Sequence, residues 1–570
     1  MTLVCVPIMV EVEDGAVAVE RALADARRAA EFGAEVIEWR LDHALDALLE
    51  VAPDAARSDA FDPLVADCPV RSLVTCRPAW EGGAFEGDEA DRLALLERFL
   101  GGAGGGTPVA LPAMVDIELA TLGRDAAFRA RVRSLARAEG SPRVIVSMHD
   151  FEGRPADLSR KLAEAYAEPA AAIVKVAFRA RSLRDNLELF EILRDAPKPT
   201  IALGMGEFGL MSRVLAPKFG GFLTFASLRD ESATAPGQPT IEELLGLYRF
   251  RSIGRETKVY GVIGWPVRQS LSPLIHNAGF EAAGHDGVYL PMPIVAGGED
   301  AEVDYTSFAA TVDALVHDPH MGFCGASVTM PFKLALSRFC FDGWDGVDDE
   351  MGGRPLPPHE PNNTLLISTP ANSDLLDAGA FDTDRRAIFE LVGEQLASAG
   401  GGAASMTVGV VGAGSVASIA AWTVKGKVRE LHVFNRDPER ARKMADAINK
   451  RSDRPWIVPH GLDDLRGSRC DFFINCTPVG MTGGPDPAGL SIPIPEMKNL
   501  PEGAVFFDTV YNPIETPMLR AAKERGFRTI DGVEMFVRQA AAQFELWTGK
   551  KAPVDLYDRL CREKLSSAGG

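Results

Sequence analysis

Short apolar runs recur along the first 250 or so residues and alternate with stretches in which apolar positions follow a helical period, such as Val19–Phe32. The runs predict β-strands at Cys5–Val10, Glu35–Arg40, Arg71–Cys76, Ala113–Leu119, Val144–Phe151, Ala171–Phe178, Thr200–Gly204 and Gly221–Phe225. Eight strands that alternate with helices over about 250 residues are typical of a (β/α)₈ barrel. The active site of such a barrel lies at the carboxyl ends of its strands.

Polar side chains gather where these predicted strands end. They are Glu38, Arg40, Arg77, Glu81, Asp116, Glu118, His149, Lys175 and Arg213, and Met205 stands at the same kind of position. An isolated charge at a strand end is usually solvated or structural. Because the carboxyl ends of barrel strands meet on one face, this convergence predicts a pocket for a polar, anionic substrate.

Two of these residues suggest covalent chemistry. Lys175 stands in the middle of the buried run AAIVKVAF, where it loses most of its hydration, which favours the neutral amine as a nucleophile toward a carbonyl. His149 ends the preceding strand and is placed to move protons beside it. A lysine that reaches the rim and a histidine that caps a strand are the alternative interpretation. Their position at neighbouring strand ends favours imine chemistry.

Ordered motifs in this half resemble one family. EWRLD, TCRPAWEGG, MVDIEL, SMHDF, IVKVAF, MGEFGLMSR and TAPGQPT are similar to type I 3-dehydroquinate dehydratase over roughly residues 1–250. The resemblance implies that Lys175 forms a Schiff base with the C3 ketone of 3-dehydroquinate. His149 would remove the C2 proton and protonate the departing C1 hydroxyl, and Glu81 would orient His149.

The same resemblance implies a set of side chains that hold the substrate hydroxyls and carboxylate. They are Glu38, Arg40, Arg77, Arg213, Thr234 and Gln238. Thr234 departs from the family, which often has serine before the A-P-G-Q turn. The hydroxyl is retained, so we expect a small effect.

Composition and charge narrow the possible functions. The chain has 570 residues, so about three domains are expected. A net charge of −20 argues against nucleic-acid binding, so anionic substrates must be drawn in by local arginines and lysines. No apolar run approaches the ~18 residues of a membrane span. The eight cysteines show no metal-binding spacing, so we expect no metal. Buried free thiols, and a strand that starts at Leu3 without room for a leader, predict a reducing compartment, the cytoplasm.

A second part of the chain, with a different pattern of strands and helices, begins after a polar linker, Arg251–Thr257. The predicted strand Thr407–Val411 runs into G-x-G-x-x-A and a helix, which indicates a dinucleotide-binding fold. The motif residues are Gly412, Ala413, Gly414, Ser415, Val416 and Ala417. NAD-specific folds usually end the next strand in an acidic residue, but here Asn435 and Arg436 stand there. A cation at that place suits a 2′-phosphate, so NADP is the predicted cofactor. Asp437, beside Pro438, is expected to cap the following helix.

The motifs around it resemble shikimate dehydrogenase over roughly residues 258–565. They are GWPVRQSLSPLIHN, GASVTMPFK, NNTLL, FDTD, INCTPVGM, DTVYNPIETPML and EMFVRQAAAQFELWTG. The resemblance implies a catalytic pair, Lys333 and Asp384, in which Lys333 supplies the proton while hydride passes from NADPH to the C3 carbonyl. Further site residues follow from it: Ser270 and Ser272 for the substrate carboxylate, Thr329, Asn363, Tyr511 and Gln539 for the rest of the substrate, and Thr477 and Met481 for the cofactor.

This half departs from the family pattern at several places. Ser327 stands where asparagine is common, and D-T-D replaces N-T-D, so that Asp382 adds a negative charge near the catalytic pair if it points inward. The Gly- and Pro-rich excursion at 342–361 lengthens the spacing from Lys333 to Asn363. None of these changes removes a charged catalytic group, although they bear on the geometry of the substrate pocket.

The sequence therefore predicts an α/β protein of three parts. Residues 1–252 form a dehydratase barrel, residues 258–375 a substrate-binding domain completed by C-terminal helices at 535–565, and residues 384–534 an NADP-binding Rossmann domain. The barrel would convert 3-dehydroquinate to 3-dehydroshikimate, and the second half would reduce that product to shikimate. Two alternatives are a dehydrogenase half that prefers quinate and a non-catalytic quinate-pathway repressor. Ser272 and Thr329 argue against the first, and Lys175, His149, Lys333 and Asp384 against the second.

Overall fold

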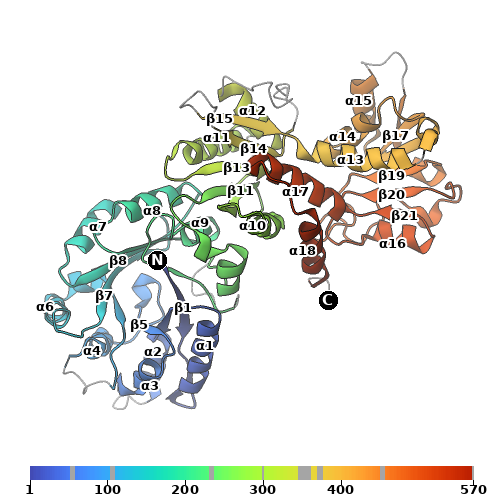
Figure 1. The fold of residues 1–570 in the computed structure, drawn as a ribbon. Coiled ribbons are helices and arrows are strands. Elements are labelled where there is room, and N and C mark those ends of the chain that lie inside the picture. Colours follow the sequence, from blue (N-terminus) through green and yellow to red (C-terminus); the bar gives the residue numbers. More distant parts are fainter. Residues whose placement is uncertain are drawn as a thin grey trace. The chain divides into compact units, whose positions relative to one another are not determined.

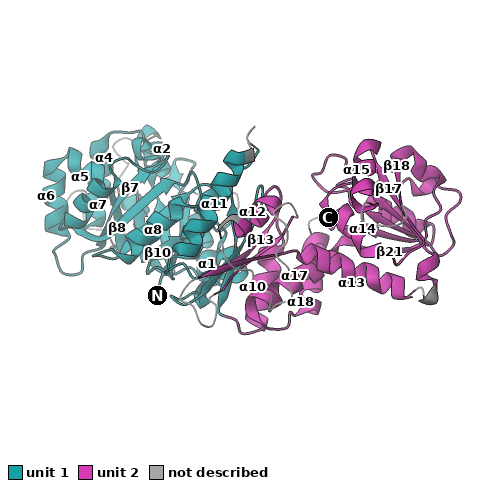
Figure 2. Ribbon diagram, turned by 90° about the horizontal axis from the view of Figure 1, so that it is seen from above, with its two compact units in different colours: residues 1–268, 286–323 teal, residues 269–285, 324–570 magenta. Residues whose placement is uncertain are grey.

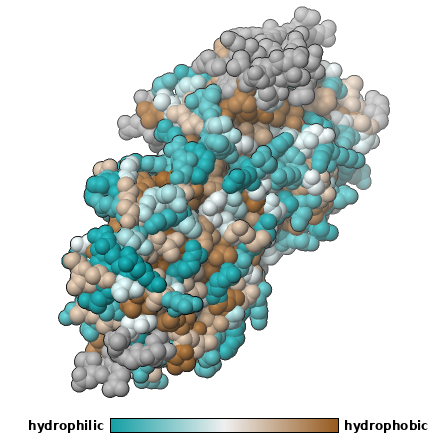
Figure 3. Space-filling view, turned by 60° about the vertical axis from the view of Figure 1, so that its left-hand side comes forward, coloured by the Kyte–Doolittle hydropathy of each residue, from teal (hydrophilic) through white to brown (hydrophobic). Residues whose placement is uncertain are grey.

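The computed structural model describes residues 1–51, 58–102, 109–229, 237–297, 301–343, 361–368, 376–398, 400–449 and 456–567. By contacts the chain divides into two compact units, coloured separately in Figure 2. Unit 1 comprises Met1–Arg268 and Asp286–Phe323, and unit 2 comprises Gln269–His285 and Cys324–Gly570. On the face shown in Figure 3, hydrophilic and hydrophobic residues are interspersed. No described helix is long and apolar enough to cross a membrane.

Unit 1 contains the predicted barrel. Its strands are parallel and follow the order β10-β1-β4-β5-β6-β7-β8-β9. The two ends of this order, β10 and β9, are joined by a hydrogen bond from Phe222 N to Thr200 O (2.8 Å), so the ring is nearly closed. The strands are β1 (Leu3–Met9), β4 (Val36–Arg40), β5 (Arg71–Thr75), β6 (Met114–Glu118), β7 (Arg143–Asp150), β8 (Ala171–Arg179), β9 (Thr200–Met205) and β10 (Leu223–Phe225).

Helices surround this ring of strands in Figure 1. They are α1 (Val19–Glu31), α2 (Asp42–Val51), α3 (Asp62–Ala66), α4 (Glu89–Phe99), α5 (Leu119–Arg124), α6 (Ala126–Leu135), α7 (Leu158–Ala167), α8 (Asp185–Arg194) and α9 (Leu210–Val214). Inside the ring, every strand contributes at least one buried residue to an apolar core, and the first of these in each strand are Cys5, Val36, Leu73, Met114, Ile145, Ile173, Ile201 and Leu223. Because side chains of a strand alternate, residues two and four positions later point inward as well, nearer the carboxyl ends. Unit 1 also holds a parallel pair, β11 (Lys258–Gly264) and β12 (Gly287–Pro293), and α11 (Ala301–His317).

Unit 2 contains three antiparallel strands: β13 (Phe323–Val328), β14 (Thr364–Ser368) and β15 (Asp377–Phe381). The first residue of β13, Phe323, is counted with unit 1. Unit 2 also contains a six-stranded sheet in the order β18-β17-β16-β19-β20-β21, in which all neighbouring strands are parallel. This is the strand order 3-2-1-4-5-6 of a Rossmann fold. The strands are β16 (Thr407–Val411), β17 (Glu430–Asn435), β18 (Ile457–Gly461), β19 (Phe472–Asn475), β20 (Val505–Asp508) and β21 (Arg528–Ile530).

Each face of the six-stranded sheet has its own apolar core. On one face α13 (Thr383–Ser398), α14 (Ser415–Val424) and α15 (Pro438–Asn449) pack against the strands. On the other face α16 (Pro517–Glu524) does so. The remaining helices of unit 2 are α10 (Ser272–Ala282), α12 (Lys333–Gly343), α17 (Gly532–Thr548) and α18 (Val554–Ser567).

Candidate active sites

One cavity of the barrel collects the predicted dehydratase residues. It is lined by Glu38, Arg40, Arg77, Glu81, His149, Lys175, Arg213 and Gln238. Strand alternation explains the gathering, because Glu38, Arg40, Arg77, His149 and Lys175 stand two or four residues after the inward core residue of their strands. The ninth predicted residue, Thr234, lies outside the described residues.

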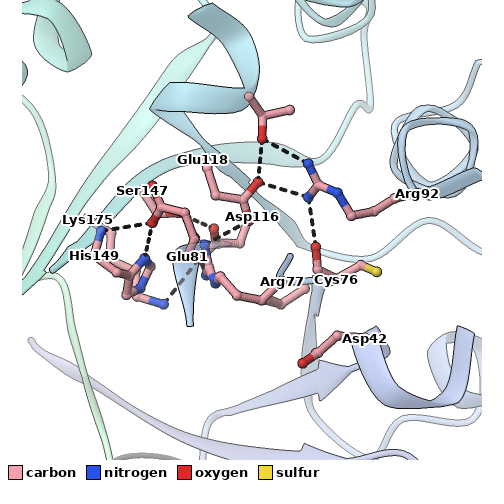
Figure 4. Close-up of polar contacts among 12 residues, drawn as sticks. Asp42, Cys76, Arg77, Glu81, Arg92, Asp116, Glu118, Ser147, His149 and Lys175 are labelled. Carbon is pink, nitrogen blue, oxygen red and sulfur yellow. Dashed lines mark hydrogen bonds and ion pairs between the residues drawn. The ribbon is translucent and has the colours of Figure 1, made fainter. Parts of the chain in front are cut away.

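Lys175 is paired inside this cavity. Its Nζ lies 3.2 Å from Asp116 Oδ2 and 4.6 Å from the centre of the Phe225 ring. Arg77 donates to Ser147 (2.8 Å) and pairs with Asp116 (3.0 Å), so the same carboxylate serves both cations. Figure 4 shows these side chains converging. Burial alone would raise the pKa of Asp116, but Arg77 and Lys175 outweigh it and hold that pKa well below its usual range.

His149 and Glu81 form the second part of the site. Glu81 Oε2 accepts from the backbone N of His149 (3.0 Å) and lies 3.1 Å from its Nδ1. Burial and the positive charges of Arg77 and Lys175 hold the pKa of His149 well below its usual range, so the ring is a neutral base. Burial raises the pKa of Glu81 to about 7 against the opposing effect of Arg77. The pair therefore joins a neutral imidazole to a carboxyl group that ionises near neutral pH.

The cations of the cavity differ in their partners. Arg40 makes a two-pronged contact with the buried Asp42 (3.0 and 2.9 Å). Arg213 is buried, its Nε has no hydrogen-bond partner, and no acidic side chain pairs with it among the residues described. Burial lowers its pKa to about 10, so it keeps its charge at neutral pH. An unpaired buried guanidinium is suited to bind a carboxylate.

Several side chains that support this site were not assigned from the sequence. Asp116 was noted only as one of the polar residues at strand ends, and Asp42, Arg92 and Ser147 were not singled out. The signal for Asp116 and Ser147 was present in the strand alternation, since each follows an inward apolar residue by two positions. Asp42 is the last residue of the EWRLD motif and begins α2, whereas Arg92 stands on α4, where no local pattern marks it.

A second charged pair lies in unit 2. Lys333, at the start of α12, places its Nζ 2.6 Å from Oδ2 of Asp384 near the start of α13. Burial opposes the ammonium form, but Asp384 outweighs it and raises the pKa of Lys333. Asn363 supports the pair, because its Oδ1 accepts from the backbone N (2.8 Å) and hydroxyl (3.0 Å) of Thr383.

The departures from the family pattern are accommodated locally. Asp382 Oδ1 accepts from Arg385 N (3.0 Å) and so caps α13. Its burial and the charge of Asp384 raise its pKa to about 6, so its carboxylate does bear on the Lys333–Asp384 pair. Ser327 donates to Gln543 (2.9 Å). Of the excursion at 342–361, residues 344–360 lie outside the described residues.

The other predicted substrate residues occupy different elements of unit 2. Ser270 Oγ accepts from the backbone N of the buried Ser272, the first residue of α10 (3.2 Å). Tyr511 follows β20 and stacks on Phe536 of α17, with ring centres 4.8 Å apart. Gln539, also on α17, donates to Phe536 O (3.1 Å). Thr329 accepts at its backbone O from Phe332 (2.9 Å), which holds the turn before Lys333.

The glycine motif fits a dinucleotide. Gly412 has φ +115°, and a Cβ there would lie 3.1 Å from Cys476 O and 3.3 Å from Thr477 Cγ2, so this position requires glycine. Gly414 is the N-cap of α14 and has open space around its Cα, so an anion can approach the first-turn amides formed by Ser415, Val416 and Ala417. Ala413 lies between the two glycines, partly buried against the core of the sheet.

Residues beyond the glycine motif complete this end of the sheet. Asn435 ends β17 and donates to Asp437 O (2.9 Å). Arg436 is exposed beside it, and Asp437 caps α15, as expected. Thr477 donates to Asn475 (2.7 Å), and Met481 follows in a turn. Among the described side chains, no group of three or more His, Cys, Asp or Glu is arranged to hold a metal.

Comparison with known proteins agrees with this arrangement. The family model of type I 3-dehydroquinase matches residues 4–255, that of the shikimate dehydrogenase substrate binding domain residues 262–347, and that of the shikimate 5'-dehydrogenase C-terminal domain residues 532–556. The bifunctional 3-dehydroquinate dehydratase/shikimate dehydrogenase, chloroplastic, of Arabidopsis thaliana is 33% identical over 575 residues, which cover 98% of this chain and 83% of the relative.

The chain belongs to the bifunctional 3-dehydroquinate dehydratase/shikimate dehydrogenase family. The shikimate dehydrogenase (NADP(+)) of Methanocella arvoryzae is 32% identical over 313 residues, 54% of this chain and 99% of the relative. A solved structure of dehydroquinate dehydratase and shikimate dehydrogenase from S. pombe AroM is 23% identical, with a TM-score of 0.40 and 98% of each chain covered. The dehydratase half of this family member is the barrel, and the dehydrogenase half includes the Rossmann sheet.

Proposed function

We propose that the chain dehydrates 3-dehydroquinate to 3-dehydroshikimate in the barrel and reduces that product to shikimate with NADPH in the second half. The observation that carries the proposal is the barrel cavity, in which a buried lysine, a neutral histidine and an arginine without an acidic partner among the described residues converge. The family membership supports both activities, a lyase and an NADP-dependent oxidoreductase.

In the barrel, the amine of Lys175 attacks the C3 ketone. One proton of that amine and one proton from solvent pass to the carbonyl oxygen, which leaves as water, so that an iminium remains. His149 then takes the C2 proton, and the electron pair of that C–H bond moves toward the iminium. As the C1–O bond breaks, His149 returns a proton to the leaving hydroxyl, so that the ring loses one water overall. Asp116 faces the cation at Lys175, and Arg213 binds the carboxylate. Hydrolysis of the imine releases 3-dehydroshikimate.

In the second half, Lys333 is the proton donor and Asp384 keeps it charged, because their 2.6 Å contact favours the ammonium. Ser270 and Ser272 bind the carboxylate, while Thr329, Asn363, Tyr511 and Gln539 line the remaining substrate site. The dinucleotide supplies the hydride when it is bound. The first turn of α14 holds its phosphates, Arg436 and Asn435 its 2′-phosphate end, and Thr477 and Met481 lie beside it.

We further propose that the functional domains are residues 1–252, 258–375 with 535–565, and 384–534. Their partners are the three small-molecule substrates, without nucleic acid or membrane. A cytoplasmic location follows from the described cysteines, all of which are free thiols and most of which are buried.

A coupled assay tests the function. The full chain with 3-dehydroquinate and NADPH should form shikimate and consume one NADPH for each molecule. Absence of 3-dehydroshikimate would reject the barrel assignment. Accumulation of 3-dehydroshikimate without oxidation of NADPH would reject the assignment of the second half as a dehydrogenase. In the reverse direction, kcat/KM for shikimate with NADP should exceed that for quinate with NAD, and the opposite order would assign a quinate dehydrogenase.

A further inference from the structure

Arg92 is a buried cation that lies behind the barrel cavity rather than in its lining. It stands on α4, is 0% exposed, and uses its whole guanidinium. Nη1 donates to Cys76 O and to Glu118 Oε2, both at 2.9 Å. Nη2 donates to Thr121 (2.8 Å), and Nε and Nη2 both contact Glu89.

Glu118 connects Arg92 to the cavity. Its two carboxylate oxygens face different cations, because Oε2 accepts from Arg92 and Oε1 accepts from Arg77 Nη1 at 2.9 Å. Figure 4 shows Glu118 between the two arginines. Thr121 closes the cluster, since its hydroxyl donates to Glu118 Oε2 (2.8 Å) while it accepts from Arg92.

Arg92 also holds the backbone next to Arg77. The carbonyl that accepts from Arg92 belongs to Cys76, the residue immediately before Arg77. Arg77 is therefore constrained at its main chain and, through Glu118, at its guanidinium. Its remaining contacts, with Asp116 and Ser147, link it to the carboxylate that faces Lys175.

We propose that Arg92 is a positioning residue for the dehydratase: it shares the charge of the buried Glu118 and so leaves Arg77 oriented toward the substrate. The inference rests on the proposed function of the barrel. Without Arg92, Glu118 would be a buried carboxylate with Arg77 as its one charged partner, and it would draw the guanidinium away from Asp116 and Ser147. Substrate binding would suffer first, because Arg77 lines the cavity whereas Arg92 does not.

The test is Arg92→Met in the full chain, with Arg98→Met as the matched control. Arg98 lies on the same helix, is 2% exposed and pairs with Asp62 at 2.6 Å, and it is not among the residues that line the cavity. In Arg92→Met the KM for 3-dehydroquinate should rise by roughly tenfold or more, the effect of one charge-assisted hydrogen bond, with a smaller fall in kcat. Arg98→Met should lower the thermal midpoint and leave that KM unchanged.

A merely structural role would reduce the active fraction, which lowers kcat and leaves KM unchanged. A KM within twofold of the unmodified chain, or an equal rise in Arg98→Met, overturns the inference. If Arg92→Met does not fold, Arg92→Lys decides: it keeps the charge but not the planar fork, so KM should still rise in a folded protein. An unmodified chain that does not dehydrate 3-dehydroquinate rejects the proposed function itself, whereas activity that is insensitive to both Arg92 variants rejects only the inference.

Discussion

Lys175 Nζ lies 3.2 Å from Asp116 Oδ2, and both side chains are buried in the barrel. The apolar strand around Lys175 removes its water, and the carboxylate replaces part of the lost stabilisation. An iminium at the same nitrogen would also be a cation. Asp116 is therefore placed to stabilise the positive charge that the iminium carries at this nitrogen.

Borohydride should trap this imine. Added together with 3-dehydroquinate, it should attach one substrate-derived mass to the peptide that contains Lys175, measured by mass spectrometry. The peptide with Lys161, which lies on α7 and pairs with Asp157 (3.2 Å), should stay unlabelled. Lys175→Ala should abolish dehydration and leave shikimate oxidation by NADP intact, because the second site is formed by other residues. Labelling of a different lysine would disprove the assignment.

The pH dependence of dehydration should reflect Glu81. Its carboxyl has a pKa of about 7, so above that pH the carboxylate can stabilise the imidazolium that forms on His149, and kcat/KM should rise through neutral pH. The low pKa of His149 keeps the base neutral well below pH 6.5. Glu81→Gln should remove the transition near pH 7 and leave the loss of kcat/KM at lower pH that protonation of His149 causes. A transition that persists in Glu81→Gln would belong to another group.

Arg436 should decide the choice of cofactor. Arg436→Ala removes a charge-assisted contact to the 2′-phosphate, so the KM for NADPH should rise roughly ten- to a hundredfold while NADH use changes little. Arg442→Ala is the control, because Arg442 is exposed on α15 and pairs with Glu439 at 3.0 Å. Equal losses with both dinucleotides would mean that Arg436 has a structural role.

Lys333 should matter for turnover more than for affinity. Lys333→Ala removes the proton donor, so kcat for shikimate oxidation should fall roughly 10²- to 10⁴-fold, the usual range for a general acid or base. KM should change far less, since the proposed carboxylate ligands Ser270 and Ser272 remain. Steady-state kinetics of both activities in one preparation measure this, with dehydration as the internal control. A large KM effect at constant kcat would make Lys333 a binding residue.

Asp382→Asn should stabilise the protein in a pH-dependent way. In the folded chain the pKa of Asp382 is about 6, above the value near 4 of an unfolded aspartate. Ionisation therefore destabilises the folded state progressively as the pH rises from about 4 to 6. Asparagine keeps the helix cap without the charge. The free energy of unfolding of the variant should therefore be higher by on the order of 1–2 kcal/mol above pH 6 and little changed near pH 4.

Thermal unfolding at a series of pH values measures this difference. Asp437→Asn, at the exposed position that caps α15, is the matched control for exchanging a capping aspartate for asparagine. A gain for Asp382→Asn that is the same at every pH would exclude the charge as its cause.

The sequence predicted the barrel and the Rossmann fold, and both are confirmed. Apolar strands such as Ala171–Phe178 and helical stretches such as Val19–Phe32 are local patterns, and their alternation along the chain restricts the topology to few solutions. The predicted barrel strands begin and end within two residues of those observed. The glycine motif was likewise readable, because the positive φ of Gly412 is a demand of the local backbone.

The candidate site was partly predictable for the same reason. Strand alternation places Lys175 and His149 inside the ring at its carboxyl end, although their roles remain predictions. What pairs with them was decided only by the tertiary structure. Asp116 could face Lys175, Arg77 or solvent until the strands closed into a ring, and the helical residue Arg92 carries no local sign of its contact with Glu118. Charge pairing depends on distances across the fold, which the order of residues does not contain.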